Sequence, residues 1–215
     1  MQKVTFVIGA NAAGKTYFIE HHLASEKAVV LNIYDYQQKV YDEHGNKELI
    51  TFEEQFRCLK KANEKHLHDI INELKQGNDV IAEQTFFKAK RRIAYIDEIR
   101  KKMDVKIEVY VMHPSNERWI ENSKKREDIE NIETYENQKK QMEFPNPAEG
   151  FDAIFEVVDD EIILRMDDIK PEIVKQARQE LTEEDTRIRR EDEREHKYRQ
   201  LIESMNIHQT ILALL

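Results

Sequence analysis

A short apolar run at residues 4–8 is followed at once by a glycine-rich segment, which constrains the fold more than any other feature of the chain. Residues 9–16 read Gly-Ala-Asn-Ala-Ala-Gly-Lys-Thr, which is the pattern G-x-x-x-x-G-K-[ST]. This pattern is typical of a phosphate-binding loop, or P-loop, when a strand precedes it and a helix follows it. The apolar run predicts that strand, and we therefore expect the segment to bind a nucleoside triphosphate.

The residue types of the P-loop explain how it would hold phosphate. Gly9 and Gly14 permit backbone angles that are closed to other residues, so successive N–H groups can point at one anion. The expected helix after the loop turns its N-terminal amides toward the same phosphates. Lys15 should reach the β- and γ-phosphates, and the Thr16 hydroxyl should bind Mg²⁺. We predict ATP and Mg²⁺ as cofactors, with nucleotide contacts from Gly9, Ala10, Asn11, Ala12, Ala13, Gly14, Lys15 and Thr16.

The chain up to about residue 168 alternates apolar, β-branched runs with helical patterns. This alternation predicts an α/β domain, a P-loop NTPase sandwich of three layers in which helices cover both faces of a parallel sheet. Thr51 and Glu54 have the spacing of a capping box that opens a helix. Strands are expected near residues 3–8, 28–33, 79–82, 105–112, 153–158 and, as a sixth, 161–166. Helices are expected near residues 15–23, 52–76, 88–102, 114–126 and 129–142.

The composition changes at about residue 170 to a helix-forming segment with dense charge of both signs. We predict a P-loop domain over residues 1–168, with a lid at about 114–145, and a helical C-terminal extension over residues 169–215. The extension has the pattern of a solvated helix that docks through its ends. A helix that forms a homodimer or binds a protein partner is the alternative.

Charge and apolar content limit the partners of the chain. Its 215 residues carry a formal net charge of −9. This charge argues against binding along duplex nucleic acid through many phosphates, but it leaves capture of one strand end open. No run reaches the ~20 apolar residues of a membrane span, and the chain enters its first strand without a signal peptide. Cys58 is the single cysteine, which fits a reducing compartment, so we expect a cytoplasmic protein without membrane contact.

Charged residues near the ends of the expected strands refine the chemistry. Asp35 follows the second strand, where its carboxylate can accept the proton of a hydroxyl that attacks the γ-phosphate. A capping or turn aspartate is the alternative. Arg126 ends a basic helix that can close over the phosphates, with Arg118 as a second candidate and a solvated helix end as the alternative. Glu83 ends the third strand and can hold a Mg²⁺ water or bind the acceptor.

Taken in order, these motifs resemble the kinase domain of 5′-hydroxyl polynucleotide kinases over about residues 1–160. The resemblance implies an adenylate-kinase-like P-loop fold and transfer of the ATP γ-phosphate to a hydroxyl. It implies that Asp35 is the general base, that Lys15 acts on the phosphates and that Arg126 is the lid arginine. Acceptor contacts are expected from Gln38, Glu83, Thr85 and Arg92. The matching segments are the P-loop, Asn32-Ile33-Tyr34-Asp35-Tyr36, Glu83-Gln84-Thr85 with Arg91-Arg92, Asn122-Ser123-Lys124-Lys125-Arg126, and residues 144–151.

The sequence leaves the acceptor undefined and allows three interpretations of the function. The resembling family usually has an arginine three residues after its base, and this chain has Gln38 there. A nucleic-acid 5′ end is the leading acceptor. A small metabolite or nucleotide sugar, as in zeta-toxin-like kinases, is the second. The third interpretation is a nucleotide-dependent switch, which would not need an alcohol-activating base such as Asp35.

Overall fold

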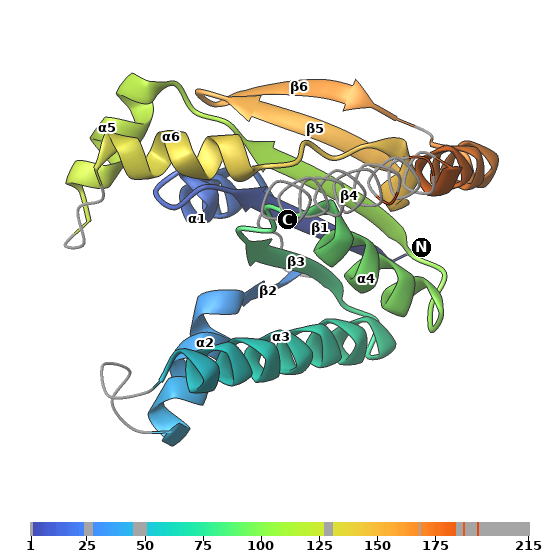
Figure 1. Ribbon diagram of the computed structural model, residues 1–215, viewed down its shortest axis with the longest axis horizontal. Coiled ribbons are helices and arrows are strands. Elements are labelled where there is room, and N and C mark those ends of the chain that lie inside the picture. The colour runs from blue at the N-terminus through green and yellow to red at the C-terminus, as the bar shows by residue number, and fades with distance from the viewer. Residues whose placement is uncertain are drawn as a thin grey trace, which may run out of the picture.

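The computed structural model describes residues 2–23, 28–44, 51–126, 131–167 and 169–183, together with positions 187 and 193. These residues form a layered α/β body built on one sheet (Figure 1). The strand order is β2-β3-β1-β4-β5-β6. The strands are β1 (Lys3–Gly9), β2 (Ala28–Asn32), β3 (Asp79–Gln84), β4 (Lys106–Met112), β5 (Ala153–Val158) and β6 (Glu161–Met166).

Strands β1 to β5 run parallel, as the alternating pattern predicts. The edge strand β6 departs from that expectation, because it pairs antiparallel to β5. Only Asp159 and Asp160 separate the two strands, and a connection of two residues reverses the chain. The result is a mixed sheet whose parallel part carries the P-loop.

The expected helices are confirmed to within three residues at each described end, and Thr51 and Glu54 form the expected capping box. None of the described helices combines the length and apolar character needed to cross a membrane. The helical elements of these expected regions are α1 (Lys15–Phe18), continued by the π-helix η1 (Ile19–Leu23), α3 (Phe52–Lys75), α4 (Ala89–Arg100), α5 (Asn116–Lys124) and α6 (Ile132–Gln141).

Helix α2 (Ile33–His44) occupies a region where the sequence analysis places the end of a strand and no helix. Its buried residues recur at helical spacing, and they pack on Cys58 and Ala62 of α3. Those residues are Ile33, Tyr36, Val40 and Tyr41. Because an apolar residue opens the helix, Ile33 continues the apolar run of β2 in the sequence and hides the boundary. The structure therefore places Asp35 in the first turn of a helix.

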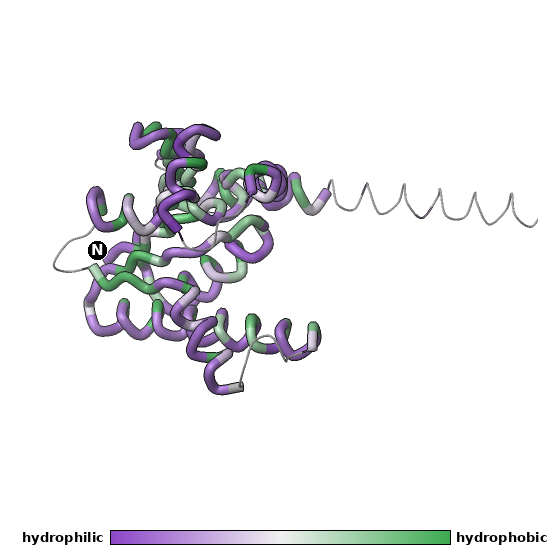
Figure 2. The backbone as a smooth tube through the Cα atoms, turned by 90° about the vertical axis from the view of Figure 1, so that its left-hand side faces the viewer, coloured by the Kyte–Doolittle hydropathy of each residue, from purple (hydrophilic) through white to green (hydrophobic). Residues whose placement is uncertain are grey.

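The sheet has a different core on each face. On the face covered by α3 and α4, Phe6 of β1 packs edge-to-face on Phe86 and Tyr95. On the other face, Val7 joins Phe18 of α1 and Trp119 of α5. Hydrophobic stretches lie mainly in the interior strands and the inner helix faces, and hydrophilic residues dominate the outer surface (Figure 2). Two separate cores thus fix the P-loop strand β1 between them.

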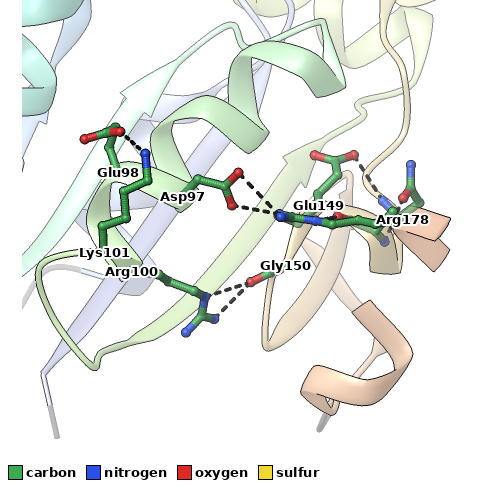
Figure 3. A network of polar contacts seen from close by, with 9 residues as sticks. Asp97, Glu98, Arg100, Lys101, Glu149, Gly150 and Arg178 are labelled. Atoms are coloured by element: carbon green, nitrogen blue, oxygen red, sulfur yellow. Dashed lines mark hydrogen bonds and ion pairs between the residues drawn. The ribbon is translucent and has the colours of Figure 1, made fainter. Parts of the chain in front are cut away.

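Residues 171–183 are helical and contact α4 and the 3-10 helix η3 (Pro147–Glu149). Figure 3 shows Arg178 of this segment between Asp97 and η3. Its guanidinium donates to Asp97 Oδ1 at 2.8 Å and to the carbonyl oxygen of Ala148 at 2.7 Å. The predicted extension thus begins as a docked helix. Its expected role in a homodimer or with a partner concerns mostly residues outside the described part and stays a prediction.

Candidate active site

The P-loop connects β1 to α1 at the carboxyl edge of the sheet, and its two glycines are required by the backbone. Gly9 and Gly14 have positive φ angles of 150° and 86°. A Cβ atom on Gly9 would lie 2.8 Å from the carbonyl oxygen of Met112 on β4, which is too close for any other residue. The loop therefore passes next to β4 because residue 9 has no side chain.

Lys15 is buried, with 5% of its surface exposed, although its side chain carries a charge. Its ammonium donates hydrogen bonds to the carbonyl oxygens of Ala10 at 2.8 Å and Gly9 at 3.2 Å. A buried cation needs such compensation. A phosphate bound by the P-loop amides would be a stronger partner than two carbonyl groups, since both members of the pair would be charged.

Glu83 lies directly below the start of α1 and joins three elements of the sheet edge. The Thr16 hydroxyl donates to Glu83 Oε1 at 2.8 Å, and the Asn32 amide donates to Glu83 Oε2 at 3.0 Å. The carboxylate is 3% exposed, and burial raises its pKa, assisted by the charge of Asp35 and opposed by Thr16 and Lys15. The hydroxyl and carboxylate oxygens fit the preference of Mg²⁺ for oxygen ligands.

A cavity of about 680 Å³ opens over the P-loop. This volume lies in the range of roughly 300–1,000 Å³ that is common for small-molecule sites. The P-loop, Asn32, Tyr34 and Glu83 form one side of it, and α5 and the β5–β6 turn form the other. Arg118 and Asn122 lie four residues apart on one face of α5, and Lys125 and Arg126 follow directly after its last residue.

The structure brings both candidate arginines to the cavity, at opposite ends of α5. Arg126 follows the last turn, where its N–H bonds the carbonyl oxygen of Ser123 at 3.1 Å, and its side chain is exposed. Arg118 lies in the first turn and forms an ion pair of 2.7 Å with Asp160 on the β5–β6 turn. Arg126 is thus the more exposed of the two.

Asp35 lies in the first turn of α2, with an exposed side chain. Its charge raises the pKa of Glu83, so the two carboxylates are electrostatic neighbours across the ends of β2 and β3. The adjacent Tyr34 lines the cavity, and Asp35 itself is outside the lining. Asp35 therefore lies just outside the cavity lining, next to Tyr34 on α2.

Asn11, the third residue of the P-loop, is a connecting point that sequence reasoning missed. Its backbone N–H donates to Gln138 Oε1 at 2.9 Å, and its carbonyl oxygen accepts from Trp119 Nε1 at 2.7 Å. Its side-chain oxygen accepts from the Tyr34 hydroxyl at 2.6 Å. The P-loop is thus tied to α5, α6 and the turn before Asp35. The sequence gives no signal for these contacts, because the partners are far apart along the chain.

The other expected acceptor residues do not gather at the cavity. Gln38 is exposed on α2 and donates to Asp42 Oδ1 at 2.7 Å. Thr85 is half-buried, and its carbonyl oxygen accepts from the Gly9 N–H at 3.4 Å. Through this hydrogen bond Thr85 supports the P-loop, and the residue does not line the cavity.

The expectation that Arg92 contacts the acceptor needs correction. Arg92 is 1% exposed, and it forms a buried ion pair with Glu149 at 2.6 Å. It also donates to the carbonyl oxygens of Phe86 and Glu143. Its guanidinium holds the segment before β5 against α4, so it has a structural position and does not line the cavity.

The sheet order, the P-loop and the cavity above it define a P-loop kinase-like domain. The chain belongs to the AAA domain family AAA_33, whose profile matches residues 4–145. No curated protein matches the chain. The fold is similar to that of a protein from Chloroflexus aurantiacus J-10-fl, described as a proposed kinase, at 18% identity and a TM-score of 0.58. That match covers 85% of this chain and 97% of the other.

Two further solved structures are similar. A chain of the Pnkp1/Rnl/Hen1 RNA repair complex matches with a TM-score of 0.50 and 16% identity, over 77% of this chain and 49% of the other. A sugar kinase from Janibacter sp. HTCC2649 matches with a TM-score of 0.49 and 15% identity, over 82% and 92% of the two chains. At these identities the matches with TM-scores of 0.58 and 0.50 show the fold and do not define the substrate.

Proposed function

We propose that the protein is an ATP-dependent kinase that transfers the γ-phosphate to a hydroxyl group. The observation that carries the proposal is the arrangement around Glu83. Its carboxylate accepts a hydrogen bond from the Thr16 hydroxyl, while Asp35 lies in the first turn of α2, just after the neighbouring strand β2. A phosphate donor site and a carboxylate base just outside the lining of the same cavity are the two parts that transfer to an alcohol requires.

On the donor side, the P-loop N–H groups and Lys15 hold the β- and γ-phosphates. Thr16 and Glu83 supply oxygen ligands for Mg²⁺, directly or through its water. Bound there, the metal would supply positive charge that neutralises the phosphates. Arg126 approaches from the end of α5 and stabilises the charge that develops on the transferred group.

On the acceptor side, Asp35 accepts the proton of the attacking hydroxyl. The hydroxyl oxygen forms a bond to the γ-phosphorus as the bond to the β–γ bridging oxygen breaks. The products are a phosphate ester and ADP. The exposed position of Asp35 fits this role, because the carboxylate must meet an acceptor that arrives from outside.

A nucleic-acid 5′-hydroxyl end is the acceptor that we favour. The order of motifs along the chain supports it, and so does the fold similarity to a chain of an RNA repair complex. A single strand end needs few phosphate contacts, so the net charge of −9 is compatible with it.

A small hydroxyl compound, such as a sugar or a nucleotide sugar, is the second candidate. The observation in its favour concerns Gln38 and Arg92, the two residues expected to bind a polymeric acceptor. Gln38 bonds Asp42, and the Arg92 guanidinium is enclosed by Glu149 and two carbonyl oxygens. Neither side chain presents a positive charge to the acceptor.

A panel of acceptors separates the candidates. ATP labelled at the γ-phosphate is offered with 5′-hydroxyl RNA, 5′-hydroxyl DNA and a set of sugars and UDP-sugars, and each product is resolved. We expect label on the 5′ end of a nucleic acid, and none with Asp35→Asn. Label on a sugar alone would select the second candidate. Label on no hydroxyl compound, with ATP binding intact, would contradict the kinase proposal.

A further inference from the structure

The turn between β5 and β6 carries two aspartates in an unusual backbone conformation. Asp159 and Asp160 have φ angles of 46° and 74°. Two-residue hairpin turns with two positive φ angles favour Asn-Gly, because glycine adopts them without strain. Strained backbone conformations of this kind cluster at functional sites. Both aspartates line the cavity above the P-loop.

Each of these carboxylates uses one oxygen for the protein. Asp159 Oδ1 accepts from the Ser115 N–H at 2.9 Å, at the N-cap of α5, and Asp160 Oδ2 accepts from Arg118 at 2.7 Å. Within the described ranges, Asp159 Oδ2 and Asp160 Oδ1 accept no hydrogen bond from the protein. The turn therefore fixes both side chains against α5 and leaves an acceptor oxygen on each.

The cavity is electrostatically polarised along α5. A Cβ on Gly14 would lie 3.4 Å from the Asn122 amide, so this part of α5 stands over the phosphate end. Arg118 lies four residues before Asn122, about 6 Å along the axis toward the start of α5, and the two aspartates contact this end of the helix. Carboxylates repel a triphosphate, and Lys15 attracts it. This repulsion favours the orientation in which the base of a nucleotide points toward Asp159 and Asp160 on the β5–β6 turn, which lies beside α5 (Figure 1).

We infer that the Asp159–Asp160 turn reads the nucleobase of the phosphate donor, and that it selects bases with an exocyclic amino group. The free carboxylate oxygens accept N–H groups and cannot donate, so they favour an amino group over a carbonyl or a bare C–H at the same position. The inference rests on the proposed function, because it assigns the base end of the same nucleotide site.

Competition binding with matched nucleotides tests the inference on the full chain. A fluorescent ATP analogue is displaced in the presence of Mg²⁺ by ATP or purine riboside triphosphate, which differ by the 6-amino group, and by GTP or ITP, which differ by the 2-amino group. A hydrogen bond to a charged group predicts that the amino member of at least one pair binds about 10-fold more tightly or better.

The double substitution Asp159→Asn with Asp160→Gly removes both carboxylates and installs the Asn-Gly sequence that this turn favours. It should bind both members of each pair equally and keep its fold. The control Glu161→Gln removes a negative charge next to the turn, outside the cavity lining, and should keep the wild-type preference.

The outcomes separate the two proposals. Equal binding of both members of both pairs by the wild-type protein would overturn the base-reading inference and leave the kinase proposal standing. A preference that survives in the double variant would overturn it as well. If no triphosphate displaces the probe more strongly from the wild-type protein than from Lys15→Ala, the nucleotide site itself is wrong, and both proposals fall.

Discussion

The proposed donor side, around the P-loop, and the proposed acceptor side, on α2, differ in how firmly their side chains are held. On the donor side, Lys15 and Glu83 are buried and bonded to the P-loop, to Thr16 and to Asn32. On the proposed acceptor side, Asp35 and Gln38 are exposed on α2. The proposed phosphate site is thus held together by contacts within the protein, whereas the proposed acceptor residues face solvent.

The largest expected effect comes from Lys15→Ala on the donor side. Loss of the ammonium removes a charged contact to the phosphates in the ground state and in the transition state. We expect kcat/KM for ATP to fall about 10³–10⁵-fold, with a native circular dichroism spectrum. Steady-state kinetics measures the change. Near-normal activity would mean that the buried lysine serves the fold alone.

Asp35→Asn is the corresponding change on the acceptor side. The amide keeps the size of the side chain but cannot accept the proton, so we expect kcat to fall about 10²–10⁴-fold. The dissociation constant for ATP should stay within about twofold, because Asp35 lies outside the cavity lining. Rapid-quench kinetics measures the rate of phosphoryl transfer, and equilibrium titration measures the dissociation constant for ATP. A variant that weakens ATP binding and transfer in parallel would contradict the separation of the two sides.

Arg92→Ala and Gln38→Ala contrast two residues that the sequence assigns to the same task. Removing Arg92 leaves Glu149 as a buried, unpaired charge, so the free energy of unfolding should fall by about 3–5 kcal/mol. Replacing the exposed Gln38 should lower the free energy of unfolding by less than about 0.5 kcal/mol. Urea denaturation measures both. Equal, small losses would show that Arg92 is not part of the core.

Tyr34→Phe is expected to have the smallest effect, and it tests the hydrogen bond that connects α2 to the P-loop. The variant removes the hydrogen bond from the Tyr34 hydroxyl to Asn11 and retains the ring. A neutral hydrogen bond contributes about 1 kcal/mol, which predicts a loss of roughly fivefold in kcat/KM for the acceptor. A loss confined to KM for ATP would place Tyr34 on the donor side instead.

The donor side could be predicted from the sequence because its signals are local. The P-loop pattern fixes Gly9 to Thr16 within eight consecutive residues, and the capping box at Thr51 marks the start of α3. Glu83 follows from the rule that sites lie at the carboxyl ends of parallel strands. The register of β2 and β3 then brings Asn32 beside it.

The remaining features depend on contacts between distant segments, which a single sequence does not display. Helix α2 is hidden because Ile33 continues the apolar run of β2, and only its packing on α3 reveals the helix. Arg92 lies in a motif that suggests substrate binding. In the structure it is buried and bonded to Glu149, which is 57 residues away along the chain. The contacts of Asn11 with Tyr34, Trp119 and Gln138 arise in the same way.

The fate of the γ-phosphate distinguishes transfer to an acceptor from hydrolysis of ATP. In a single turnover with excess enzyme, the labelled phosphate is followed into inorganic phosphate and into phosphate ester, with and without the best acceptor of the panel. We predict that the label moves to the acceptor, and that Asp35→Asn stops this movement while ATP remains bound. Release as inorganic phosphate at one rate, with or without an acceptor and in both proteins, would contradict the account.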